Sequence, residues 1–114
     1  MTEKRIASLR EFYPYYLNEH SDFTNRVLHF IGTGIVISLL IFGLLTHLYN
    51  LLYFLPVAGY GFAWIGHFFI EKNKPATFKY PLYSLTSDFI MFWHILTFQI
   101  GKKMADAQSK KHLY

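Results

Sequence analysis

The stretch VLHFIGTGIVISLLIFGLLTHLYNLLYFLPVAGYGFAWIGHFFI, residues 27–70, contains no Asp, Glu, Lys or Arg. A soluble domain of 114 residues would expose part of such a run to water, where charged side chains are common. The run is long enough for two membrane-spanning helices, because roughly 20 apolar residues cross a hydrocarbon core. The sequence therefore predicts an integral membrane protein.

The run is divided into two predicted membrane-spanning helices that form a hairpin. The first covers about 27–48 and is preceded by Asp22, a residue type that favours a helix N-cap. The second covers about 51–70, and the residues at 49–50 are interpreted as the turn between the two helices.

Two further helical segments flank the predicted hairpin. Residues 2–17 are interpreted as an amphipathic helix at the bilayer surface, which Pro14 is expected to disturb. Residues 81–100 form a third apolar helical segment, expected to re-enter the membrane, to lie along its surface, or to break within 84–87. The predicted fold class is all-α, an integral membrane helical bundle that forms a single membrane-embedded domain over residues 1–114.

The charges lie on both sides of the uncharged run and give a formal net charge of +4. Lysines and arginines beside apolar segments favour anionic lipid headgroups over nucleic acid as partners. Their distribution predicts a multi-pass protein whose N-terminus and 71–79 loop are cytoplasmic. The absence of cysteine excludes disulfides, thiolate metal sites and thiol nucleophiles.

Polar residues gather at one end of the predicted hairpin. Asn25 and His29 lie one turn apart on the first helix, and His67 and Glu71 repeat that spacing at the end of the second. His20 precedes the first helix, so the antiparallel hairpin is expected to bring these side chains together. Imidazoles with a carboxylate suit a divalent transition metal, and two or three histidines would suit non-haem iron.

Asp88 lies in the third apolar segment and is expected to be either a further metal ligand or an acceptor that orients a histidine. His47, His94 and His112 are interpreted as structural or solvated. Two alternatives to an iron enzyme remain open from the residues alone. One is a non-catalytic lipid- or partner-binding scaffold with a buried hydrogen-bond network, and the other is a different metal-dependent lipid enzyme.

Two stretches, GHFFIEKNKPATFKYPLYSLTSDFIMFW at 66–93 and HSDFTNRVLHFIG at 20–32, resemble the Mpo-like family. This family comprises small multi-span membrane proteins, formerly an uncharacterised domain family, whose fungal member is a 2-hydroxy fatty acid dioxygenase. The resemblance runs from about His20 to Gly101 and so covers most of the chain.

The resemblance implies an Fe(II)-dependent dioxygenase that shortens a 2-hydroxy fatty acid by one carbon (alpha-oxidation), with molecular oxygen as co-substrate. The implied partners are membrane lipid or the fatty acid itself. Among the residues that match polar positions of the family pattern, the resemblance implies His20, His29 and His67 as metal ligands. It implies four further site residues with a catalytic role: Asn25, Glu71, Asn73 and Asp88.

Overall fold

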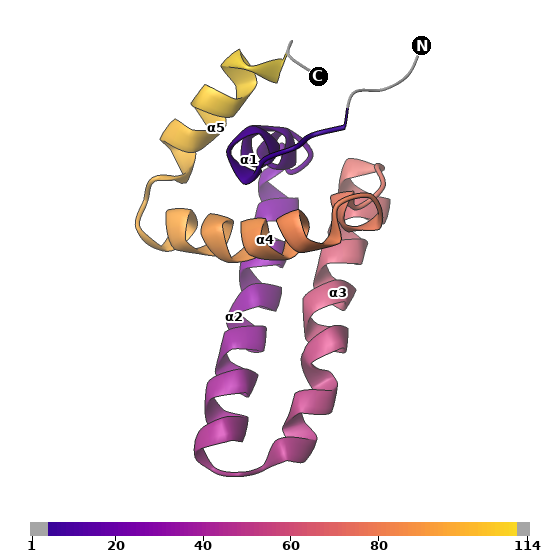
Figure 1. The fold of residues 1–114 in the computed structure, drawn as a ribbon, viewed down its shortest axis with the longest axis vertical. Coiled ribbons are helices and arrows are strands. Elements are labelled where there is room, and N and C mark those ends of the chain that lie inside the picture. The colour runs from indigo at the N-terminus through magenta and orange to yellow at the C-terminus, as the bar shows by residue number, and fades with distance from the viewer. Residues whose placement is uncertain (1–4, 112–114) are drawn as a thin grey trace. The chain divides into compact units, whose positions relative to one another are not determined.

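The computed structural model describes residues 5–111, and all regular structure within that range is helical (Figure 1). This confirms the all-α prediction. The elements, in chain order, are helix α1 (Leu9–Asn18), helix α2 (Phe23–Leu45), 3-10 helix η1 (Tyr49–Phe54), helix α3 (Leu55–Ile65), π-helix η2 (Gly66–Glu71), 3-10 helix η3 (Ala76–Phe78), helix α4 (Pro81–Leu96) and helix α5 (Ile100–Ser109).

Contacts within the chain define two compact units. The first unit combines Met1–Ser21 with Ala76–Tyr114, and the second is the continuous segment Asp22–Pro75. The organisation of the whole chain as a single membrane-embedded domain remains a prediction.

The second unit is a helical hairpin in which α2 and α3 run side by side (Figure 1). Asp22 begins α2 as predicted, because its carboxylate accepts a hydrogen bond from the Thr24 amide at 2.8 Å. Gly32 allows the two helices to approach closely, since a Cβ there would lie 3.0 Å from the Ala58 carbonyl oxygen.

The turn of the hairpin lies earlier than predicted. Helix α2 ends at Leu45, and His47 adopts a left-handed conformation with φ of 61°. The predicted turn residues at 49–50 belong to η1 instead. The Thr46 hydroxyl donates to the Phe42 carbonyl at 2.7 Å and helps to end the helix, a local interaction that hydropathy does not reveal.

The segments Phe23–Leu45 and Tyr49–Glu71 are each 23 residues long and apolar enough to cross a membrane, by length and composition. Only 22% of the apolar window in the first and 17% of that in the second is buried inside the protein. A core helix of a soluble protein would be mostly buried. The exposed apolar side chains of both segments favour contact with lipid.

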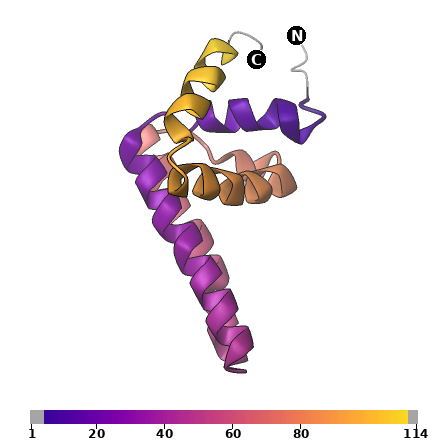
Figure 2. The ribbon, with the colours of Figure 1, turned by 90° about the vertical axis from the view of Figure 1, so that its left-hand side faces the viewer.

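The first unit packs α1 on α4 and α5 (Figure 2). Phe12, Tyr16 and Leu17 of α1 are buried in its core, where the Phe12 and Tyr80 rings lie 5.2 Å apart. The buried face of α1 therefore contacts protein. Buried residues on both sides of Pro14 explain why the helix continues through this proline to Asn18.

The predicted N-terminal helix is shorter than expected. It begins at Leu9, because the Ser8 hydroxyl accepts a hydrogen bond from the Glu11 amide and caps the first turn. Residues 2–4 of the predicted helix lie outside the described range, as does His112.

The third apolar segment is interrupted at 97–99, so that one of the three alternatives for it, a break within 84–87, is wrong. Ser84 and Ser87 are buried in the middle of α4, which begins at Pro81. Phe98 has φ of 61° and separates α4 from α5. A left-handed non-glycine residue carries no clear sequence signal, so the break could not be located from the sequence.

Candidate metal centre

Two buried histidines face each other in the second unit. His29 on α2 and His67 in η2 have ring centroids 5.0 Å apart and ring planes at 84°. Their candidate ligand nitrogens lie within 4.8 Å of each other. Bonds from histidine nitrogens to a metal ion are about 2.1 Å long, so nitrogens at this separation lie close to the spacing that one shared ion requires. The pair could therefore hold a metal ion.

Both histidines of the pair are held in one tautomer by carbonyl oxygens. The His29 Nδ1 lies 3.0 Å from the Asn25 backbone oxygen, and the His67 Nδ1 lies 2.7 Å from the Asn73 Oδ1. A carbonyl oxygen only accepts hydrogen bonds, so each Nδ1 carries the proton and each lone pair lies on Nε2. This is the arrangement in which metal-binding histidines are normally held.

His20 belongs to the first unit and follows the end of α1. It is buried, and its Nδ1 lies 2.6 Å from the Tyr16 backbone oxygen. The Tyr16 ring packs against the imidazole, with centroids 4.1 Å apart. His20 therefore has the same tautomer as the pair, with its lone pair on Nε2. The sequence did not identify Tyr16 as a site residue, because an aromatic residue in an amphipathic helix looks the same as one that only packs in the hydrophobic core.

The Glu71 carboxylate is oriented by the first turn of α2. Its Oε1 accepts hydrogen bonds from the Asp22 amide at 2.6 Å and from the Asn25 side-chain amide at 3.3 Å. Asn25 is fully buried, and its Oδ1 has no hydrogen-bond partner among the described residues. A buried acceptor in this state costs about 1–3 kcal/mol, and such groups are rare in folded proteins.

The backbone at the end of the second span departs from α-helical geometry. Helix η2 is a π-helix and ends at Lys72, which is left-handed with φ of 58°. The His67 carbonyl then accepts from the Lys72 amide and also from the Asn73 amide, at 2.9 Å. This reversal brings the Asn73 side chain back to the His67 ring. π-Helical turns are frequent at functional sites, but no residue type in the sequence marks this one.

Gly66 lies at the point where η2 contacts α2. A Cβ at this position would lie 1.7 Å from the Asn25 Oδ1, so no side chain larger than hydrogen fits. The glycine thus allows the buried amide to pack directly against the backbone of η2.

Asp88 lies in the first unit and not in the hairpin. It is half-buried and accepts a hydrogen bond from the Tyr16 hydroxyl, so it supports the residue that holds His20. Burial raises the pKa of the Asp88 carboxyl to about 7, although the Tyr16 hydrogen bond partly opposes this shift. Burial and the neighbouring Asp88 raise the pKa of the Tyr16 hydroxyl well above its usual value, so Tyr16 remains the donor.

Two other histidines have tyrosine hydroxyls as partners. The His94 Nδ1 lies 2.7 Å from the Tyr13 hydroxyl, and the His47 Nδ1 lies 2.7 Å from the Tyr49 hydroxyl. These contacts agree with a structural role for both residues.

A sequence model of one protein family matches residues 6–100 of the chain, and its description is 2-hydroxy-palmitic acid dioxygenase Mpo1-like. The match covers all seven residues named above as ligands or further site residues. No curated protein and no solved structure matches the chain.

Replacing Gly66 by alanine should disrupt the packing of Asn25 against η2. We expect Gly66→Ala to lower the stability of the protein by about 1–3 kcal/mol, as overpacking of a filled interior does. Gly61→Ala is the matched control, because its added Cβ would meet no atom within 4 Å. Thermal unfolding in detergent measures both variants, and equal stability of the two would contradict the close contact at Gly66.

The raised pKa of Asp88 predicts a pH-dependent stability. The folded protein retains a proton that the unfolded chain releases, so stability should fall by roughly 1–4 kcal/mol as pH rises through the window between the two pKa values. That window runs from 3.8 to about 7. Asp88→Asn should remove this dependence, whereas Asp106→Asn on the exposed side of α5 should preserve it. Thermal unfolding across this pH range tests it, and an unchanged profile in Asp88→Asn would refute the assignment.

Proposed function

Because the chain belongs to the family described as 2-hydroxy-palmitic acid dioxygenase Mpo1-like, we propose that it is an Fe(II)-dependent membrane enzyme of the dioxygenase class. Its proposed substrate is a 2-hydroxy fatty acid, which it shortens by one carbon with molecular oxygen. Beyond family membership, one observation carries the proposal, namely the His29–His67 pair with both Nδ1 protons held by carbonyl oxygens. Buried neutral imidazoles of this kind suit a first-row divalent metal.

His20 is the proposed third ligand. Two peptide units separate it from Asp22, so their Cα atoms are at most about 7.6 Å apart, however the two units of the chain are arranged. The Asp22 amide donates to Glu71, which lies one helical turn after His67. The backbone therefore keeps His20 at the end of the hairpin that carries the pair, and its tautomer matches theirs.

The residues fit a non-haem iron centre by the chemistry of their donors. Imidazoles with an adjacent carboxylate are the donor types found in non-haem Fe(II) oxygenases, which commonly use two histidines and one carboxylate. When bound, Fe(II) would supply the redox chemistry that a reaction with molecular oxygen requires. Glu71 is a proposed positioning residue, because its Oε1 already accepts two hydrogen bonds from the start of α2.

Asn25 is proposed to position Glu71, because its side-chain nitrogen donates to the Glu71 Oε1 at 3.3 Å. The basic loop is proposed to act on the substrate. Lys72 and Lys74 are exposed directly after η2 and can attract the carboxylate of the substrate. The alkyl chain of the substrate would remain in the hydrocarbon layer.

The hairpin is proposed to cross the membrane as two spans, which would make the protein multi-pass. Both ends of the hairpin then lie at the same membrane face, because the Asp22 amide contacts Glu71. The distribution of lysine and arginine favours the cytoplasmic side for this face, for the N-terminus and for the 71–79 loop.

The test is turnover of a 2-hydroxy fatty acid by detergent-purified protein loaded with Fe(II). We expect oxygen consumption and a product one carbon shorter. His67→Ala should abolish turnover, and Asn73→Ala should lower it about 10–100-fold, because the His67 ring loses the partner of its Nδ1. His47→Ala is the control, since that residue lies at the opposite end of the hairpin and should retain activity.

Two outcomes would contradict the proposal. A product with an unchanged number of carbon atoms would indicate a different metal-dependent lipid enzyme. Absence of turnover in folded, Fe(II)-loaded protein would favour a non-catalytic scaffold.

A further inference from the structure

Helix α4 has two chemically different faces. Ser84, Ser87 and Met91 are buried on one face, which lies in the first unit with α1. The other face exposes large apolar side chains at intervals of three or four residues, which places them on one stripe of the helix. These residues are Leu82, Leu85, Phe89, Trp93 and Leu96.

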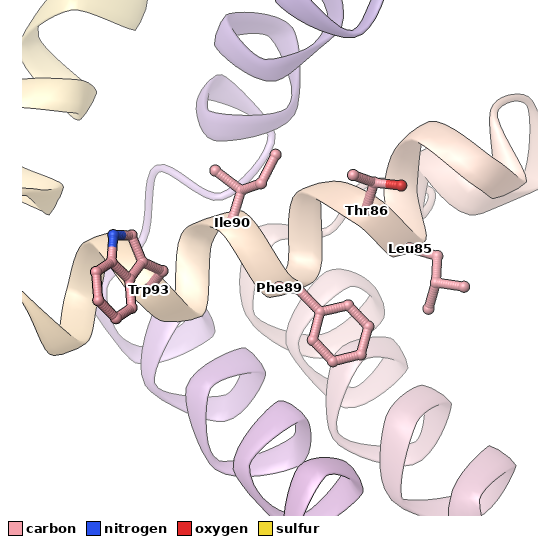
Figure 3. A pocket seen from close by; sticks show the side chains of 5 residues that line it. All are labelled: Leu85, Thr86, Phe89, Ile90 and Trp93. Atoms are coloured by element: carbon pink, nitrogen blue, oxygen red, sulfur yellow. The ribbon is translucent and has the colours of Figure 1, made fainter.

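The middle of the exposed stripe is hollowed. Leu85 and Phe89 project from the same side of α4, and with Thr86, Ile90 and Trp93 they line an open depression of about 480 Å³ (Figure 3). Every lining side chain except Thr86 is wholly apolar or aromatic. A surface of this kind fits hydrocarbon chains better than water.

The length and surroundings of α4 exclude a membrane crossing. The helix has 16 residues, and at 1.5 Å per residue it is about 24 Å long, whereas the hydrocarbon core is about 30 Å thick. It ends at the break beside Phe98 and is followed by the polar helix α5. It also packs on α1, which carries the exposed charged residues Arg10 and Glu11. Lipid can therefore cover only one face of α4.

Basic residues lie at both ends of the apolar stripe. At the start of α4, the Arg5 guanidinium and the Lys79 ammonium lie 4.7 Å and 5.7 Å from the centroid of the Tyr80 ring. Beyond its end, α5 begins with Lys102 and Lys103 in its first turn. Cations around an apolar stripe that contains tryptophan are typical of helices lying in an anionic membrane interface.

We propose that α4 lies at the boundary between headgroups and acyl chains of an anionic leaflet, with its Leu85–Phe89–Trp93 stripe toward the acyl chains. The inference rests on the proposed membrane crossing of the hairpin. Both connections between the units, at 21–22 and 75–76, leave the hairpin at the end where Asp22 contacts Glu71. Both connections therefore lie at one face of the membrane.

The test measures the depth of a tryptophan in the bilayer. The chain has two tryptophans, so Trp64→Phe leaves Trp93 as the only one. The full chain is reconstituted into vesicles of phosphatidylcholine and phosphatidylglycerol that contain lipids brominated at either shallow or deep acyl positions. The reference variant carries Ile35→Trp together with Trp64→Phe and Trp93→Phe, because Ile35 is exposed near the middle of α2.

We expect shallow bromines to quench Trp93 most strongly and deep bromines to quench the Ile35→Trp reference most strongly. Deep quenching of Trp93 would overturn the interfacial position in favour of insertion into the core. Absence of Trp93 quenching beside a deeply quenched reference would overturn the inference alone, because α4 would then face water or protein. Failure to quench either tryptophan would overturn the membrane crossing of the hairpin as well.

The anionic preference has its own measurement. In vesicles of phosphatidylcholine alone, shallow quenching of Trp93 should fall about twofold or more, since the basic residues lose their partners. Unchanged quenching would overturn the role of anionic lipid.

Discussion

The hydrogen bonds that Glu71 accepts from the start of α2 connect the two ends of the hairpin, and the candidate site depends on this connection. Asp22 and Glu71 lie at the two ends of the hairpin, where α2 begins and η2 ends. The Asp22 amide and the Asn25 side chain then meet Glu71. This fixes the register between α2 and η2, and that register places His29 beside His67.

The backbone around His67 combines several features that are unfavourable by themselves. A π-helix, a left-handed lysine and a buried amide oxygen without a partner among the described residues all occur within or against 66–73. Each is tolerated because its neighbours constrain it, and together they hold the His67 ring by its Nδ1 through Asn73. Local strain of this kind is concentrated where a side chain must be held in one orientation. Tyr16 holds His20 in a comparable way in the first unit, and Asp88 in turn accepts a hydrogen bond from Tyr16.

The hairpin and the meeting of its polar ends could be predicted from the sequence, whereas the exact helix ends and the packing of α1 could not. Hydropathy and the Asp22 cap predicted the hairpin, and one-turn spacing predicted the contact of its polar ends. The sequence did not reveal the left-handed residues that end helices at His47, Lys72 and Phe98, because none is a glycine. It also did not reveal that α1 packs on α4 and α5, since an amphipathic face fits protein and membrane equally well. Packing between segments that are far apart in the sequence determines that α1 contacts α4 and α5.

We propose that one iron is bound by His20, His29 and His67. This can be tested by X-ray absorption at the iron edge, together with metal analysis, on detergent-purified protein loaded with Fe(II). We expect one iron per chain with three imidazole ligands in the unaltered protein, and loss of one imidazole in His20→Ala. Folded protein that binds no iron, or iron whose imidazole count is unchanged by His20→Ala, would contradict it.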